Sequence, residues 1–269
     1  MAIRTNFLGQ LPGDYAYSIA GQLSWVSLIY EIIQEAIILP LFFFLGNIDR
    51  ETFANRLRSG LCFTAIIYTI CSILVSAFAI PLLNLMAVSP ELIRESATYI
   101  RIESIGFIVE ILFSFMLVAL VTLERSSTIY FLTFIKCFIS IGLDTVLISE
   151  LPISLHLGVI GVGITNIVSN LLLFAVTIIV IHKCGVNVFT TKRIDYSWLR
   201  KLKTIGGISG LESFVRNIAY MLMVSRLVNM VGEQGAYWVA NNFIWGWLLL
   251  PVLQLGELIK RDTAANSWA

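Results

Sequence analysis

Long apolar runs separated by short polar segments alternate along most of the chain. Their length and hydropathy predict transmembrane helices, because about 20 mostly apolar residues suffice to cross a bilayer. Runs of this length indicate spanning helices rather than the shorter, alternating strands of a membrane barrel. We therefore expect an all-α, polytopic helical membrane protein with about seven transmembrane helices, at 17–45, 58–88, 98–123, 129–149, 158–182, 205–231 and 235–258.

The predicted helix 205–231 carries many polar side chains for a membrane span. At about 100° per residue they fall on one stripe, and most of the remaining surface is apolar. The stripe consists of Ser209, Glu212, Ser213, Arg216, Tyr220 and Arg226, with Asn217 beside it. A charge facing lipid is costly, so the stripe is expected to face other helices or a wet cavity. Glu212 and Arg216 have the spacing of a helical ion pair, which leaves both a structural and a functional role open.

The predicted helix 17–45 has a polar stripe of its own. Glu31 and Glu35 lie one turn apart on it and repel each other unless one is protonated or a cation binds. This pattern predicts a proton or sodium site, and the alternative is pairing with basic residues of neighbouring helices. Pro40 is expected to break the same helix and to expose carbonyl groups as ligands or as a hinge.

Other predicted helices carry isolated acids and small residues. Glu110 is the deeper acid of 98–123, and Asp144 lines one face of 129–149, where the alternative role is to pair with an arginine across the bundle. Gly158, Gly161 and Gly163 are expected to allow close helix packing. The full set of candidates for ion coupling or for a substrate cavity is Glu31, Glu35, Glu110, Asp144, Glu212, Arg216, Asn217, Tyr220, Asn241 and Asn242.

Composition agrees with a membrane protein. Hydrophobic residues make up 58% of the chain and charged residues 13%, whereas soluble domains carry about 25% charged residues. The net charge of +1 gives no reason to expect a nucleic-acid partner. No nucleophile triad, metal cluster or nucleotide motif is present in the sequence, so we expect no enzyme, no metal site and no cofactor. We expect a multi-pass protein of the cell (inner) membrane, surrounded by membrane lipids.

Basic residues gather in the loops on one side of the predicted helices, above all in 183–203. By the positive-inside rule this loop is cytoplasmic. Its part Asp195–Lys203 is typical of a short amphipathic helix in the membrane plane, with a capping residue at its start. The loop divides the chain into a first lobe at 1–187, a linker at 188–204 and the start of a second lobe at 205–269.

An internal repeat agrees with this division. The segments 16–34 and 236–254 share the pattern A-Y-x-x-A-x-x-x-x-W and further identities after it. If 235–258 repeats 17–45, then 205–231 needs a counterpart that precedes 17–45 and ends near Leu11. Internal repeats are common in transporters. We therefore expect the chain to be a fragment of a longer transporter that cannot transport alone.

Three segments together resemble the MATE (multidrug and toxic compound extrusion) family. They are GLESFVRNIAY at 210–220, GAYWVANNFIWG at 235–246, and GLDTVLIS at 142–149 with LGVIGVGITNIVSN at 157–170. The resemblance implies roughly helices two to eight of a twelve-helix, two-lobe antiporter that acts as a monomer when full length. Such a protein exports small organic compounds, often cationic, in exchange for sodium ions or protons by alternating access, and the resemblance makes Glu212 the coupling acid.

Two other functions stay open at this point. One is a lipid-linked saccharide flippase of the same superfamily. The other is a seven-helix receptor, against which stand the lack of an outer cysteine pair and of an Asn-Pro motif in 235–258. A transport assay that compares drug cations with lipid-linked glycans would separate these classes.

Overall fold

The computed structural model describes residues 2–11, 15–46, 48–186, 188, 194–252, 255–256 and 259. Parts of the predicted linker 188–204 and the end of the predicted helix 235–258 lie outside these residues. Within the described part the chain is helical and has no strand. The elements are α1 (Ala2–Gln10), α2 (Ala16–Leu45), α3 (Arg50–Ala77), α4 (Ala79–Leu85), α5 (Pro90–Thr122), α6 (Ser126–Leu147), α7 (Gly158–Lys183), α8 (Leu199–Tyr220), the π-helical turn η1 (Met221–Ser225), α9 (Arg226–Met230), α10 (Gln234–Phe243) and the π-helical turn η2 (Ile244–Leu248).

The protein is an all-α polytopic membrane protein. Five of the described helices are long and apolar enough to cross a membrane: Ala16–Leu45, Arg50–Ala77, Pro90–Thr122, Ser127–Leu147 and Gly158–Lys183. The two further spans predicted at 205–231 and 235–258 are helical where they are described, but they do not meet the same criteria. Basic and acidic residues lower the hydropathy of α8, and π-helical turns divide both stretches.

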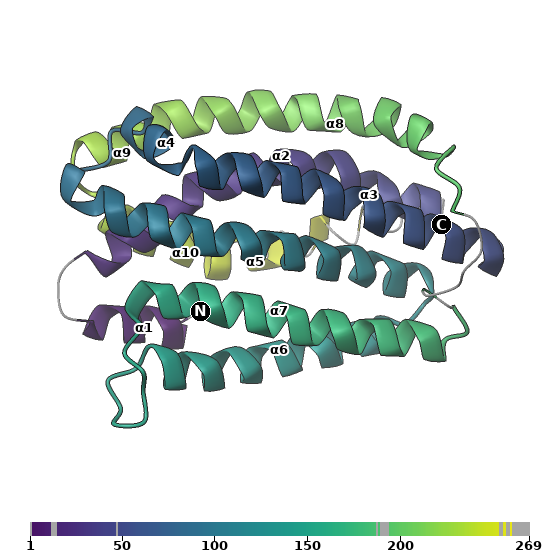
Figure 1. The fold of residues 1–269 in the computed structure, drawn as a ribbon, viewed down its shortest axis with the longest axis horizontal. Helices are drawn as coiled ribbons and strands as arrows, with labels where there is room; N and C mark the ends of the chain where they lie inside the picture. The colour runs from purple at the N-terminus through teal and green to yellow at the C-terminus, as the bar shows by residue number, and fades with distance from the viewer. Residues whose placement is uncertain are drawn as a thin grey trace.

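The long helices lie side by side along the longest axis of the molecule (Figure 1). Helix α8 forms one edge, α6 and α7 form the opposite edge, and α2, α3 and α5 lie between them. Large buried side chains from α2, α3 and α5 fill the centre, among them Trp25, Tyr68, Phe115 and Leu120. Helix α2 contacts α8, α10, α5 and α3, so it joins the two predicted lobes.

Helix α2 does not break at Pro40 as predicted. It runs from Ala16 to Leu45 with the proline inside it. Proline removes one backbone hydrogen bond of a helix and strains the preceding turn. Buried neighbours such as Ile38, Leu41 and Phe44 pack this stretch into the core, and that packing sustains the helix through the proline.

The predicted in-plane helix over Asp195–Lys203 is the beginning of α8. The side chain of Asp195 accepts hydrogen bonds from Ser197 N and Ser197 Oγ at 2.8 and 2.7 Å, and the backbone bond lowers the pKa of Asp195. Helix α8 then starts at Leu199 and continues without interruption to Tyr220. The buried Trp198 fixes this start, because its Nε1 donates to Ser59 Oγ of α3 at 2.8 Å.

Two glycines let α8 approach α2 closely. A Cβ on Gly206 would collide with the carbonyl oxygen of Ala36, and a Cβ on Gly210 would lie 2.9 Å from the Cβ of Ala36. Small residues four apart are a common way to bring membrane helices together. We call the contact of Gly206 and Gly210 with Ala36 the glycine seam. It fixes how α8 is rotated relative to α2.

The close packing predicted for three glycines is confirmed at Gly161 and Gly163. At Gly158 a Cβ would meet only Leu11 Cδ1, at 3.8 Å, so the prediction is wrong there, and this glycine instead has a positive φ of 58° at the start of α7. A Cβ on Gly161 would lie 2.9 Å from Ile148 Cγ1, and a Cβ on Gly163 would lie 2.7 Å from Ile102 Cγ2. Both glycines therefore bring α7 against its neighbours. In this way they position Asn166, three residues after Gly163 on that helix.

Candidate functional site

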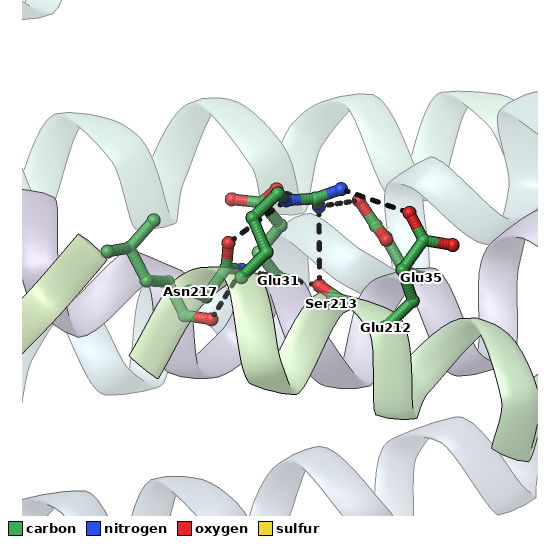
Figure 2. A network of polar contacts seen from close by, with 7 residues as sticks. Glu31, Glu35, Glu212, Ser213 and Asn217 are labelled. Carbon is green, nitrogen blue, oxygen red and sulfur yellow. Dashed lines mark hydrogen bonds and ion pairs between the residues drawn. The ribbon is translucent and has the colours of Figure 1, made fainter. Parts of the chain in front are cut away.

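Arg216 of α8 reaches across to two carboxylates of α2 (Figure 2). Its Nη2 lies 2.7 Å from Glu35 Oε1 and 3.4 Å from Glu31 Oε1. The predicted pair within the helix also exists, but Arg216 Nη1 is 3.8 Å from Glu212 Oε1. Of the alternatives for Glu31 and Glu35, the structure contains the pairing with a basic residue of a neighbouring helix. We call Glu31, Glu35, Glu212 and Arg216 the Arg216 cluster.

Asn217 ties the same part of α8 to α2. Its Nδ2 donates to the carbonyl oxygen of Leu28 and to Ser213 Oγ, each at 3.3 Å. Its Oδ1 accepts from Arg216 Nε at 3.4 Å. Both Asn217 and Ser213 are buried, so they face α2 as the predicted polar stripe requires.

The protein itself leaves the charged groups of this cluster partly uncovered. The exposed side-chain fractions are 50% for Arg216, 43% for Glu31, 29% for Glu35 and 77% for Glu212. Exposed ion pairs contribute little to stability, because water competes for both partners. The carboxylates are therefore available to another cation.

Glu31 and Glu35 also line a cavity of about 470 Å³ with Glu110 of α5. Aromatic rings form much of its wall, including Tyr30, Tyr68, Phe107 and Phe42. The rings of Tyr30 and Phe107 are stacked with their centroids 4.2 Å apart. We call this space the acidic cavity. It joins three of the carboxylates that the sequence singled out.

Asp144 belongs to a separate, more buried group. Arg4 of α1 donates to it twice, from Nε to Oδ2 at 2.8 Å and from Nη2 to Oδ1 at 3.1 Å. Arg4 Nη1 also donates to Asn166 Oδ1 at 3.0 Å, and Asn166 Nδ2 donates to Glu103 Oε1 at 2.7 Å. The alternative role of Asp144, pairing with an arginine across the bundle, is thus the one present.

A second cavity of about 750 Å³ lies beside the Arg4 group. Polar side chains from α1, α2, α6 and α7 line it, together with aromatic side chains from α10 and η2. It shares Ser27 and Phe107 with the acidic cavity, so the two spaces adjoin. Its charged lining residues are Arg4, Lys136 and Asp144.

Three other candidates, Asn241, Asn242 and Tyr220, are not part of the Arg216 cluster. Asn242 lines the second cavity, and its Nδ2 donates within its own helix to the Trp238 carbonyl oxygen at 2.9 Å. Asn241 is half-buried on α10, and Tyr220 is exposed at the end of α8. Glu212 touches Arg216 but is not among the residues that line either cavity.

The sequence did not single out Arg4 or Lys136 as functional residues. Arg4 lies in a short stretch without an apolar run, so hydropathy gave no reason to place it inside the bundle. The internal repeat, which required a helix ending near Leu11, was the signal that could have found it. Helix α1 ends at Gln10, in agreement with that requirement.

No group of three or more His, Cys, Asp and Glu side chains could hold a metal ion within the described part of the chain. Comparison of the chain with family models, curated proteins and solved structures gives no match.

Proposed function

We propose that this membrane protein exports organic cations in exchange for sodium ions or protons. The observation that carries the proposal is the acidic cavity, in which Glu31, Glu35 and Glu110 stand beside the rings of Tyr30 and Phe107. Carboxylates attract a cation, and aromatic faces bind an organic cation by cation–π contact and by burial of its apolar part. The resemblance of the chain to the MATE family points to the same substrates.

Exchange follows from competition for the same carboxylates. Glu31 and Glu35 face the cavity and at the same time hold Arg216 of α8. A bound organic cation, a sodium ion and a proton each neutralise these carboxylates, so the binding of one weakens the binding of the others. Each also weakens the hold on Arg216, so occupancy of the cavity is coupled to the position of α8. This coupling is the element that alternating access requires.

The direct test is binding of tetraphenylphosphonium to the purified protein in a non-ionic detergent, measured by equilibrium dialysis. We expect binding that weakens as sodium ions are added or as the pH falls. Glu31→Gln combined with Glu35→Gln should weaken it roughly tenfold, the effect expected of a lost charge partner in a partly desolvated site. The matched control is Glu91→Gln, because Glu91 is exposed in the first turn of α5.

The test has clear contrary outcomes. Binding that neither sodium ions nor protons reduce would contradict the exchange. Equal affinity in the double variant and in the Glu91→Gln control would remove the acidic cavity as the cation site.

A further inference from the structure

Lys136 is a positive charge in the middle of a membrane helix. Helix α6 spans Ser126–Leu147, so Lys136 lies roughly 15 Å from either end. Its Nζ is 5.6 Å from the centroid of the Phe113 ring. Among the described residues, no carboxylate lies within ion-pair distance of it. A charge at this depth is costly without a partner, so we expect Lys136 to bind an anion.

The acid on the same helix is already occupied. Asp144 lies two turns from Lys136 and accepts two hydrogen bonds from Arg4. The charges that line the second cavity are therefore two positive groups and one negative group, and the negative group is committed to Arg4. Lys136 lines this cavity, and its ammonium group lies over the Phe113 ring without a carboxylate partner among the described residues.

The two cavities follow one another along α2 and α5. On α2, Ser24 lines only the second cavity, Ser27 lines both and Glu31 lines only the acidic cavity. On α5, Phe107 lines both cavities and Glu110 lines only the acidic one. The combined space therefore contains three carboxylates in one cavity and the Lys136 side chain in the lining of the adjoining one.

We propose that the combined cavity binds an organic zwitterion. Its cationic group lies at Glu31, Glu35 and Glu110, and its anionic group binds the Lys136 ammonium. Its apolar body lies between them, against the rings of Phe107 and Trp238, which line the shared level and the second cavity. The binding of the cationic group rests on the proposed function. The binding of the anionic group rests on Lys136 alone.

The test is a series of ω-trimethylammonio carboxylates with short, intermediate and long alkyl spacers, each compared with its methyl ester by titration calorimetry. The ester keeps the cation and lacks the anion. At the spacer length that lets both charges reach their partners at once, the acid should bind about tenfold more tightly than its ester. Shorter and longer spacers should show a smaller advantage, because one of the two charges is then left without its partner.

Substitutions of Lys136 test whether this residue binds the anionic group of the ligand. Lys136→Met should make acid and ester bind equally, and Lys136→Arg should keep the preference for the acid. Lys183→Met is the matched control, because Lys183 is exposed at the end of α7. Binding of the ester also shows that the variant is folded. If Lys136→Met does not fold, the spacer series on the native chain and Lys136→Arg still decide the matter.

The outcomes separate this inference from the proposed function. Equal binding of acid and ester by the native chain, or a preference for the acid that survives Lys136→Met, would overturn the zwitterion proposal while tetraphenylphosphonium binding could stand. Failure of tetraphenylphosphonium and of every ester to bind would overturn the proposed function, and the zwitterion proposal with it.

Discussion

Two arginines in this protein hold carboxylates across helices, and they do so in opposite settings. Arg4 forms two hydrogen bonds with Asp144, and the exposed side-chain fractions of the pair are 22% and 4%. Arg216 divides its contacts among Glu31, Glu35 and Glu212, and half of its own side chain is exposed. The protein encloses most of the first pair, whereas it leaves the second partly uncovered.

The difference separates a structural role from an exchangeable one. Removing one partner of a buried ion pair leaves an uncompensated charge, which is strongly destabilising. Exposed pairs are worth only about 0–1 kcal/mol, so a competing cation can replace the arginine at low cost. Arg4 therefore stabilises the bundle, and Arg216 is the arginine that a ligand in the acidic cavity can displace.

The largest effect is expected for Arg4→Met. The variant leaves the carboxylate of Asp144 buried without a cation and should lower the free energy of unfolding by about 3–5 kcal/mol. Denaturant unfolding in mixed micelles measures it. Adding Asp144→Leu should recover more than half of the loss, because no unpaired charge then remains. A loss below about 1 kcal/mol for Arg4→Met would show that the buried pair is not structural.

The next effect concerns the packing that seats α8 beside the Arg216 cluster. Gly206→Ala places a Cβ against the carbonyl oxygen of Ala36, a backbone atom that cannot move aside alone. We expect a loss of about 3 kcal/mol, at the upper end for overpacking. Gly207→Ala is the matched control, since a Cβ there has nothing within 4 Å. It should be neutral or slightly stabilising, because alanine favours helix by up to about 1 kcal/mol. Equal losses of unfolding free energy in Gly206→Ala and Gly207→Ala would rule out the close contact between Gly206 and Ala36.

A smaller effect is expected at a buried neutral contact between α9 and α2. Asn229 and Gln22 exchange amide hydrogen bonds of 2.9 and 3.2 Å, and Asn229 Nδ2 also donates to the Met86 carbonyl oxygen at 3.0 Å. Asn229→Leu removes these three bonds, leaves Gln22 only its bonds to Trp25 and Ser18, and should cost about 2 kcal/mol. Thermal unfolding compares it with Asn241→Leu, a half-buried control on α10. A loss equal to that of the control would mean that charge, rather than this amide contact, holds the C-terminal helices on α2.

The smallest effect on stability is expected for Arg216→Met, below about 1 kcal/mol. The salt dependence of the stability loss should distinguish Arg216→Met from Arg4→Met. At about 1 M salt the Debye length is about 3 Å, so the exposed Arg216 contacts are screened in the native chain. The difference between the native chain and Arg216→Met should then vanish, whereas the Arg4→Met deficit should persist. A persistent Arg216→Met deficit at high salt would indicate that this pair is also structural.

Several features of the fold could be predicted from the sequence. The predicted helix 158–182 and the observed α7 (Gly158–Lys183) agree within one residue at the C-terminal end, because apolar runs and glycine positions are local signals. The largest boundary errors are at the starts of the predicted helices 58–88 and 98–123, because α3 begins at Arg50 and α5 at Pro90, in polar turns that hydropathy leaves out. The continuity of α2 through Pro40 and of α8 through Gly206 depends on neighbours that lie far away in the sequence.

The sequence by itself determined that the chain is helical and spans a membrane, and that Glu31, Glu35, Asn217 and Arg216 lie on polar stripes. Hydropathy and helical periodicity depend only on the order of the residues, so they are visible without a structure. Only the tertiary structure decided which arginine meets which acid. The Gly206 and Gly210 seam turns Arg216 toward α2, and the packing of α1 against α6 brings Arg4 to Asp144. Such pairings depend on the rotation of whole helices, which is set by many contacts distant in sequence, and no single stretch of residues encodes it.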